Sequence, residues 1–148
     1  MAAPQAIDVQ AFALTQLSLL ADELAAETAS TSALLSSTSP SILSRAGLAI
    51  TNLVIASQRT GLGGKTVLEL EQDHAIGNAG DIGEHGIRVG DIVRVGEQPK
   101  GNEKKKEKAG MEAKGVEGVV VRVGQKAVQV ALGKVEDGIH GLGGRLWV

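Results

Sequence analysis

A glycine-rich run between two β-like segments limits the fold of this chain more than any other part of its sequence. Residues 53–66 read LVIASQRTGLGGKT, and the last three, Gly64, Lys65 and Thr66, resemble the end of a phosphate-binding loop. Such a loop has the form GxxxxGKS/T and joins a buried strand to a helix, whose N-terminus binds the phosphates. The first glycine of that pattern belongs at the position that Arg59 occupies here.

The residues after the run favour a turn between two strands. Residues 67–71 alternate apolar and polar side chains, which is typical of a half-buried strand and not of a helix. Glycine readily adopts the positive φ that tight hairpin turns require. We therefore predict a β-hairpin turn at residues 61–64. An independent nucleotide-binding enzyme, which would rest on Gly64-Lys65-Thr66 alone, is the weaker interpretation.

The composition restricts both the core and the ligands. Phe12 and Trp147 are the two aromatic residues among 148, so the core must be aliphatic and the usual stacking surface for single-stranded bases is missing. The chain has no cysteine, which excludes disulfides, thiolate metal sites and cysteine nucleophiles. A net charge of −2 implies no strong overall attraction to nucleic acid. With no signal-peptide pattern and no membrane-spanning run, we expect a soluble protein, and the lack of cysteine is compatible with an intracellular setting.

The first 47 residues have a helical pattern. Residues 7–29 are rich in good helix formers, and one apolar stripe runs along them. The stripe consists of Ala13, Leu17, Leu20 and Leu24. The Ser/Thr-rich residues 28–41 are expected to fray or loop. A short second helix is predicted at residues 39–47, with Ser39 as N-cap, proline next and Gly47 as C-cap.

The remaining residues, 48–148, have a β pattern. Short strand-like segments with glycine at their corners lie at residues 48–57, 65–71, 90–95, 118–123, 127–132 and 145–148. This pattern predicts a small open antiparallel barrel of the SH3-like or OB-like kind, and the chain as a whole is assigned to the α+β class.

A charged insertion interrupts the predicted barrel at residues 97–114. It contains six lysines and four glutamates and almost nothing apolar, so we expect a mobile loop. Its lysines either contact phosphates or form a solvated surface whose charge the glutamates partly cancel. The lysine cluster consists of Lys104, Lys105, Lys106 and Lys108.

Arg59 and Lys65 flank the predicted turn and complete the set of candidate nucleic-acid contacts. Arg59 could present its planar guanidinium group to a phosphate or brace the hairpin, and both interpretations stay open. The histidines are predicted to be surface residues, because separations of 11 and 55 residues fit no compact zinc pattern. They are His74, His85 and His140. No catalytic residue and no metal site is predicted.

Several motifs, in order along nearly the whole chain, resemble one family. They are the leading helix with Phe12 and Thr15-Gln16-Leu17, then Leu43, Arg45, Gly47 and Leu48, then SQRTGLGG at residues 57–64, GDIV at 90–93, and the GVV hairpin at 118–131. This arrangement is similar to the N-terminal stalk and 1B barrel region of superfamily 1 helicases of the immunoglobulin-mu-binding-protein or DNA polymerase alpha-associated helicase type.

The resemblance implies a helical stalk segment at residues 1–47 and a barrel at 48–148 that lies over the nucleic-acid channel of a helicase. The chain would then be an accessory nucleic-acid-guiding region, non-catalytic by itself. Its partners would be single-stranded DNA or RNA and the motor domains of the same protein. ATP and Mg are expected for the parent helicase, and no cofactor for this chain. The apolar stripe is expected to pack partly on the barrel or to self-associate. An SH3-like module that binds a protein or ribosome surface is the alternative.

Overall fold

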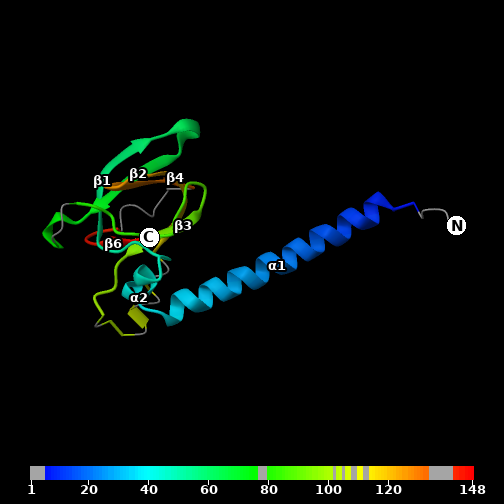
Figure 1. Cartoon of the computed structure of the whole chain (residues 1–148), viewed down its shortest axis with the longest axis horizontal. Helices are drawn as coiled ribbons and strands as arrows, with labels where there is room; N and C mark the ends of the chain where they lie inside the picture. The colour runs from blue at the N-terminus through cyan, green and yellow to red at the C-terminus, as the bar shows by residue number, and fades with distance from the viewer. Residues whose placement is uncertain are drawn as a thin grey trace. The chain divides into compact units, whose positions relative to one another are not determined.

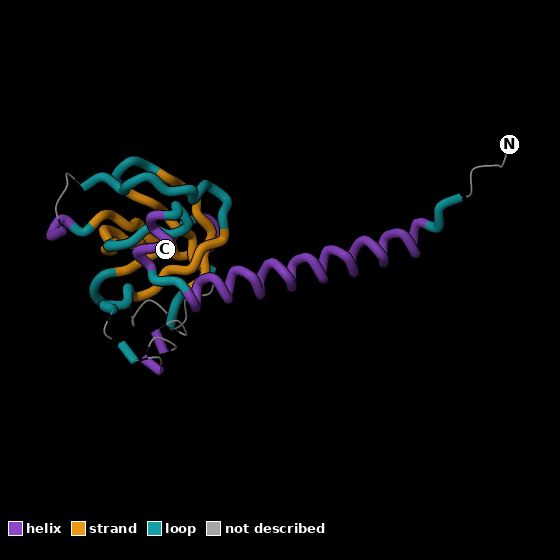
Figure 2. The backbone as a smooth tube through the Cα atoms, turned by 60° about the horizontal axis from the view of Figure 1, so that its bottom comes forward, coloured by secondary structure: helices purple, strands orange, loops and turns teal. Residues whose placement is uncertain are grey.

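Six antiparallel strands form a closed barrel that follows two helices along the chain (Figures 1 and 2). The computed structural model describes residues 6–76, 80–101, 103–104, 106–107, 110–111, 114–133 and 142–148. The chain divides into two compact units, of which the first ends at Ser39 and the second runs from Pro40 to Val148. The predicted α+β class and small barrel are confirmed, but the barrel is closed, whereas the sequence suggests an open one.

Helix α1 extends from Val9 to Ser37 and begins at a capping aspartate. The Asp8 carboxylate accepts hydrogen bonds from the backbone N–H groups of Gln10 and Ala11, at 3.0 and 3.3 Å. These are two of the donors that the first turn of a helix leaves unpaired. The cap therefore fixes where the helix starts.

Residues 28–37 of the Ser/Thr-rich stretch belong to α1, so for them the prediction of fraying or a loop is wrong, and the helix ends at the extended Thr38. The Thr28 hydroxyl donates to the Leu24 carbonyl at 2.7 Å, and the Ser36 hydroxyl donates to the Ala33 carbonyl at 3.1 Å. Because these hydroxyls bond to carbonyls one turn back, their polar groups are satisfied without leaving the helix.

The residues of the predicted apolar stripe all lie within α1, and its leucines are exposed. Leu17, Leu20 and Leu24 are between 60% and 64% exposed, and no residue of α1 is buried. None of the described helices is long and apolar enough to cross a membrane.

Helix α2, Pro40–Arg45, confirms the predicted short helix and ends in a Schellman cap. The N–H groups of Gly47 and Leu48 donate to the carbonyls of Ser44 and Leu43, at 3.0 and 2.9 Å. Leu43 is 1% exposed. The second unit therefore includes α2, which the sequence assigns to the N-terminal segment.

The strands follow one another around the barrel in the order β1-β2-β5-β4-β3-β6. Their bounds are β1 Leu53–Thr60, β2 Thr66–Gln72, β3 Ile92–Glu97, β4 Val116–Val123, β5 Ala127–Leu132 and β6 Leu146–Trp147. The predicted segments match them closely, except that the first was expected from residue 48. Asn52 explains the later start, because its φ of 60° is left-handed and interrupts an extended strand.

The barrel core is aliphatic, as the composition requires. Alternate residues of β2 and β5 point inward, including Leu68, Leu70, Val128, Val130 and Leu132, and each is 0% exposed. The residues between them face outward and carry the polar groups that could meet a ligand.

The two-residue strand β6 closes the barrel. Leu146 pairs with Leu53 of β1 on one side and with Glu97 of β3 on the other. Directly after β6, Val148 exchanges two backbone hydrogen bonds with Ile50, at 2.8 and 2.9 Å. Leu146 is also 1% exposed, so it contributes to the core as well as to the pairing.

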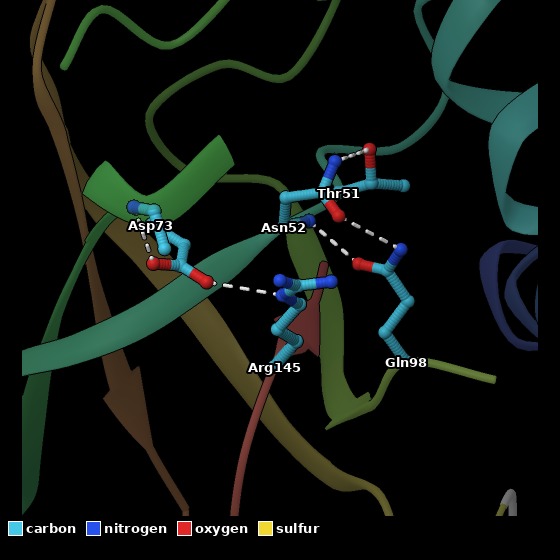
Figure 3. A network of polar contacts seen from close by, with 6 residues as sticks. Thr51, Asn52, Asp73, Gln98 and Arg145 are labelled. Carbon is cyan, nitrogen blue, oxygen red and sulfur yellow. Dashed lines mark hydrogen bonds and ion pairs between the residues drawn. The ribbon is translucent and has the colours of Figure 1, made fainter. Parts of the chain in front are cut away.

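Polar side chains reinforce this closure (Figure 3). The Gln98 side chain accepts a hydrogen bond from the Asn52 backbone N–H at 2.6 Å and donates to the Asn52 side-chain oxygen at 3.1 Å. Arg145, just before β6, donates to the Asp73 carboxylate at 3.0 Å. The N–H of Ala75 and then Arg145 lower the pKa of Asp73. The Gln98 contacts thus join the end of β3 to the start of β1, and the Arg145 contact joins the segment before β6 to the end of β2.

Replacing Leu146 by alanine should lower the free energy of unfolding by about 2–5 kcal/mol, because it leaves a cavity where the barrel closes. Urea unfolding measures the change. Leu62→Ala is the matched control, since Leu62 is fully exposed and its loss should change stability by less than about 0.5 kcal/mol. Equal effects of the two substitutions would show that β6 does not hold the barrel closed.

Candidate nucleic-acid interface

The glycine run forms a β-hairpin turn, as predicted. The single-turn 3-10 helix η1, Leu62–Gly64, joins β1 to β2, and Gly63 and Gly64 have φ values of 75° and 73°. Thr66 begins a strand, so no helix N-terminus follows Lys65 to bind phosphates. The run therefore does not fit ATP.

Arg59 lies on the outer face of β1, next to this turn. Its Nη2 donates a hydrogen bond to Gln129 Oε1 on β5 at 2.8 Å, and so reaches across β2. Among the described residues this is the one hydrogen bond of the exposed Arg59 side chain. The bracing interpretation is therefore supported, while most donors of the guanidinium group stay accessible.

Arg59 borders a row of polar side chains that the sequence analysis does not identify. Ser57 of β1, Glu69 of β2 and Gln129 of β5 are cross-strand neighbours. The Ser57 hydroxyl donates to Glu69 at 2.8 Å, and the Gln129 amide donates to the other Glu69 oxygen at 3.3 Å. The strand alternation indicates that Glu69 and Gln129 face outward, but their adjacency depends on the strand register.

The row holds one carboxylate between two arginines. The hydrogen bonds from Ser57 and Gln129 lower the pKa of Glu69 most, partial desolvation opposes them, and the charges of Arg59 and Arg122 lower it further. Glu69 in turn weakens the positive field that the two arginines offer to a phosphate. Binding at this surface would therefore depend on salt concentration but would involve few charges.

The predicted lysines lie in two separate places. Lys65 is exposed at the hairpin turn, near Arg59, whereas Lys104 and Lys106 are exposed in the insertion after β3. Lys105 and Lys108 lie outside the described residues, as do several others of the insertion, so its mobility stays a prediction.

The strand register explains why the hairpin and the insertion lie apart (Figure 1). The insertion follows Glu97, which is joined through Leu146 to Leu53, the first residue of β1. The hairpin turn begins after Thr60, the last residue of β1. At about 3.3 Å per residue, the two points are roughly 20 Å apart along this strand. The candidate contacts within the described residues therefore do not form one cluster.

The described histidines show no metal-binding arrangement. Among the described residues, no three His, Asp or Glu side chains gather as metal ligands would. His74 opens the short helix η2, His74–Ile76, and His85 is half-buried in the connection that follows β2. His140 lies outside the described residues.

Comparison with known proteins connects these features to one family. The family described as the 1B domain of helicase SMUBP-2/HCS1 matches residues 14–142. The DNA polymerase alpha-associated DNA helicase A of Schizosaccharomyces pombe is 37% identical over 97 residues. That match covers 66% of this chain and 14% of the relative, so the chain spans a small part of that helicase's length.

Replacing Glu69 by glutamine should lower the free energy of unfolding at neutral pH and have little effect in acid. The pKa of Glu69 is lower in the folded state than its ordinary value of 4.5, so the ionised group stabilises the fold above that value. This contribution disappears as the pH falls through the folded-state pKa. Urea unfolding of both proteins from neutral pH to about pH 3 measures the difference.

Glu71→Gln is the matched control, because Glu71 lies on the same strand and face as Glu69 but makes no side-chain hydrogen bond within the described part of the chain. A destabilisation by Glu69→Gln that persists unchanged at low pH would contradict the role given to the ionised group.

Proposed function

This chain belongs to the family of the SMUBP-2/HCS1 helicase 1B domain, and from that premise we propose that it is a nucleic-acid-guiding accessory region of an ATP-dependent helicase. The family match over residues 14–142 is the observation that carries the proposal. Motor domains of the same protein would hydrolyse ATP with Mg, and this region would be non-catalytic. The parent protein would act inside the cell, in the nucleus or the cytoplasm.

We propose the β1–β2 hairpin as the place where this region meets single-stranded DNA or RNA. Arg59 keeps most of its donors free, and Lys65 is exposed a few residues further along. Both belong to a hairpin whose strands are paired without interruption from Ser57 to Thr60, beside the turn, so their charges are held near fixed positions. Contacts of this kind reach the phosphates, so binding would be independent of sequence.

Single-stranded DNA and RNA should bind weakly, and the affinity should fall as salt is raised from about 50 to 200 mM. Arg59→Gln should reduce the slope of log affinity against log salt by about 0.7, the value for one lost phosphate contact on a single strand. Fluorescence anisotropy of labelled oligonucleotides measures both quantities. The lysines of the insertion, Lys104, Lys105, Lys106 and Lys108, can be tested in the same way by substitution with glutamine.

Gln129→Ala is the matched control, because it removes the partner of Arg59 and leaves the charge in place. If Gln129→Ala reduces the slope as much as Arg59→Gln does, Arg59 acts as a brace and not as a phosphate contact. Absence of binding at low salt would remove the direct role in nucleic-acid guiding. Mg-dependent nucleotide binding that Lys65→Ala abolishes would instead support the enzyme interpretation.

An interaction module that binds a protein or ribosome surface is the second candidate function. The observation that favours it is an exposed apolar surface on β3 and β4, where Ile92 is 78% exposed. Such a module would require no nucleic-acid contact, and the salt titration distinguishes it from the first candidate.

We also propose that the isolated chain self-associates through α1. Leu17, Leu20 and Leu24 offer an apolar stripe with no buried residue on the helix. The charged residues of α1 are all acidic, and Glu23 is its middle residue. In a parallel or an antiparallel pair, the acidic groups near the centre would face one another and repel.

Self-association should therefore strengthen with salt, in contrast to nucleic-acid binding, because salt screens the repulsion over about 3–10 Å. Light scattering coupled to size exclusion measures the mass at low and high salt. Leu17→Glu with Leu20→Glu should give a monomer. Ala26→Glu, on the opposite face of the helix, is the control and should leave association intact. A monomeric mass at both low and high salt would rule out self-association through α1.

A further inference from the structure

The outer surface of β3 and β4 carries a cluster of exposed apolar side chains, which we call the β3–β4 patch. Its members are Val89, Ile92, Val119 and Val121, with exposed fractions of 63%, 78%, 40% and 43%. Ile92 and Val119 lie directly opposite each other on the paired strands. The patch is therefore centred on this cross-strand pair, with Val121 two residues further along β4 and Val89 just before β3.

The inward positions of the same strands already supply the core. Val95 of β3 is 0% exposed and Val120 of β4 is 1% exposed. The outward positions of β2 and β5 carry Glu69 and Gln129, which is the ordinary pattern for a solvated face. On β3 and β4 the outward positions at Ile92 and Val119 are apolar instead. An exposed apolar surface with a polar rim is typical of a protein interaction site.

The rim of the patch is rich in arginine. Arg88 precedes Val89, Arg94 follows Ile92 by two residues on the same face of β3, and Arg122 follows Val121. All three are exposed, and none forms an ion pair among the described residues.

The nearby acidic groups compensate these charges in part, and Glu69 on β2 already interacts with the charge of Arg122. Asp91 accepts a hydrogen bond from the Arg88 backbone N–H at 2.8 Å, and Glu117 lies opposite Arg94 without an ion pair in the described structure. A Cβ atom at Gly115 would lie 2.9 Å from Arg94 Cδ, so this glycine lets the arginine lie across the start of β4. The Arg94 side chain therefore leans away from Ile92 and leaves it open.

We propose that the β3–β4 patch binds an acidic amphipathic helix of a partner protein. The aliphatic side chains would pack against the apolar face of the helix, and the arginines would meet the carboxylates at its edges. This inference deepens the second candidate function, because it names the chemistry of the protein partner.

Two features of the barrel favour a helix over other ligands. β4 is paired with β3 on one side and β5 on the other, and β3 is paired with β4 and, at Gly96 and Glu97, with β6, so an added strand could reach only the short edge at residues 92–95. A helix satisfies its own backbone and needs only a surface. The patch contains no aromatic side chain, so it lacks the stacking surface that single-stranded bases use.

The test uses the full chain and two synthetic helical peptides. Both peptides carry leucine at positions i, i+3, i+4 and i+7, and the flanking positions are glutamate in one and lysine in the other. Fluorescence anisotropy should show binding of the glutamate peptide and at least about tenfold weaker binding of the lysine peptide. Ile92→Ser should weaken binding of the glutamate peptide by about tenfold. Leu62→Ser, which alters another exposed leucine-sized side chain outside the patch, should have no effect.

A double variant with reversed charges tests the role of the arginines separately from the apolar contacts. Arg88→Glu with Arg94→Glu should reverse the preference, so that the lysine peptide binds more tightly than the glutamate peptide. Circular dichroism of each variant checks that the barrel is still folded. Equal affinities for both peptides, or no binding of either, would overturn the proposal.

The oligonucleotide titration separates this inference from the nucleic-acid proposal. Ile92→Ser should leave oligonucleotide binding unchanged. If it weakens oligonucleotide binding and leaves the peptide affinity unaltered, the patch is a nucleic-acid surface and the inference is wrong. If Arg59→Gln leaves the salt dependence of oligonucleotide binding unchanged while the peptide results are as expected, only the proposed hairpin interface is contradicted.

Discussion

The pairing of Leu146 with β1 on one side and β3 on the other is the interaction on which the rest of the barrel depends. Without it, both strands would have a free edge, and unpaired edges expose backbone groups that attract other strands. The pairing is short because β6 contains two residues, and side-chain hydrogen bonds beside it add to the pairing. Gln98 bonds to Asn52 and so joins the end of β3 to the start of β1, while Arg145 bonds to Asp73 and so joins the segment before β6 to the end of β2 (Figure 3).

The closed barrel gives the outward side chains two surfaces of different chemistry. On β1, β2 and β5, the outer side chains form a hydrogen-bonded row around Glu69, with Arg59 and Arg122 nearby. On β3 and β4, Ile92 and Val119 make the surface apolar. A polar surface with a few cations is suited to phosphate contacts, and an apolar surface with an arginine rim is suited to a protein helix. The two proposed interfaces, for nucleic acid and for a partner helix, are therefore built on different strands of one small barrel.

Local sequence predicted the elements whose physical causes are local. The turn at Gly63 and Gly64 follows from the need for positive φ, and the C-cap at Gly47 follows from the same requirement. Alternation of polar and apolar residues located the strands, because a strand with one buried face has a period of two. The Ser/Thr-rich end of α1 was mispredicted, since hydroxyl groups can stabilise a loop or bond back to the helix. The choice between these outcomes depends on the whole helix.

By itself, the sequence determined the hairpin, the aliphatic core, the order of the strands along the chain and the resemblance to a helicase region. It also identified Arg59 as a candidate contact, because the arginine stands next to a glycine turn. Only the tertiary structure decided which side chains are neighbours. The register joined Ser57, Glu69 and Gln129 across three strands and placed the hairpin far from Lys104 and Lys106. Closure by β6 paired Leu53 of β1 and the end of β3, and left the outward faces of the strands available to partners. Such adjacency depends on the register between distant strands, and no local pattern of residues contains it.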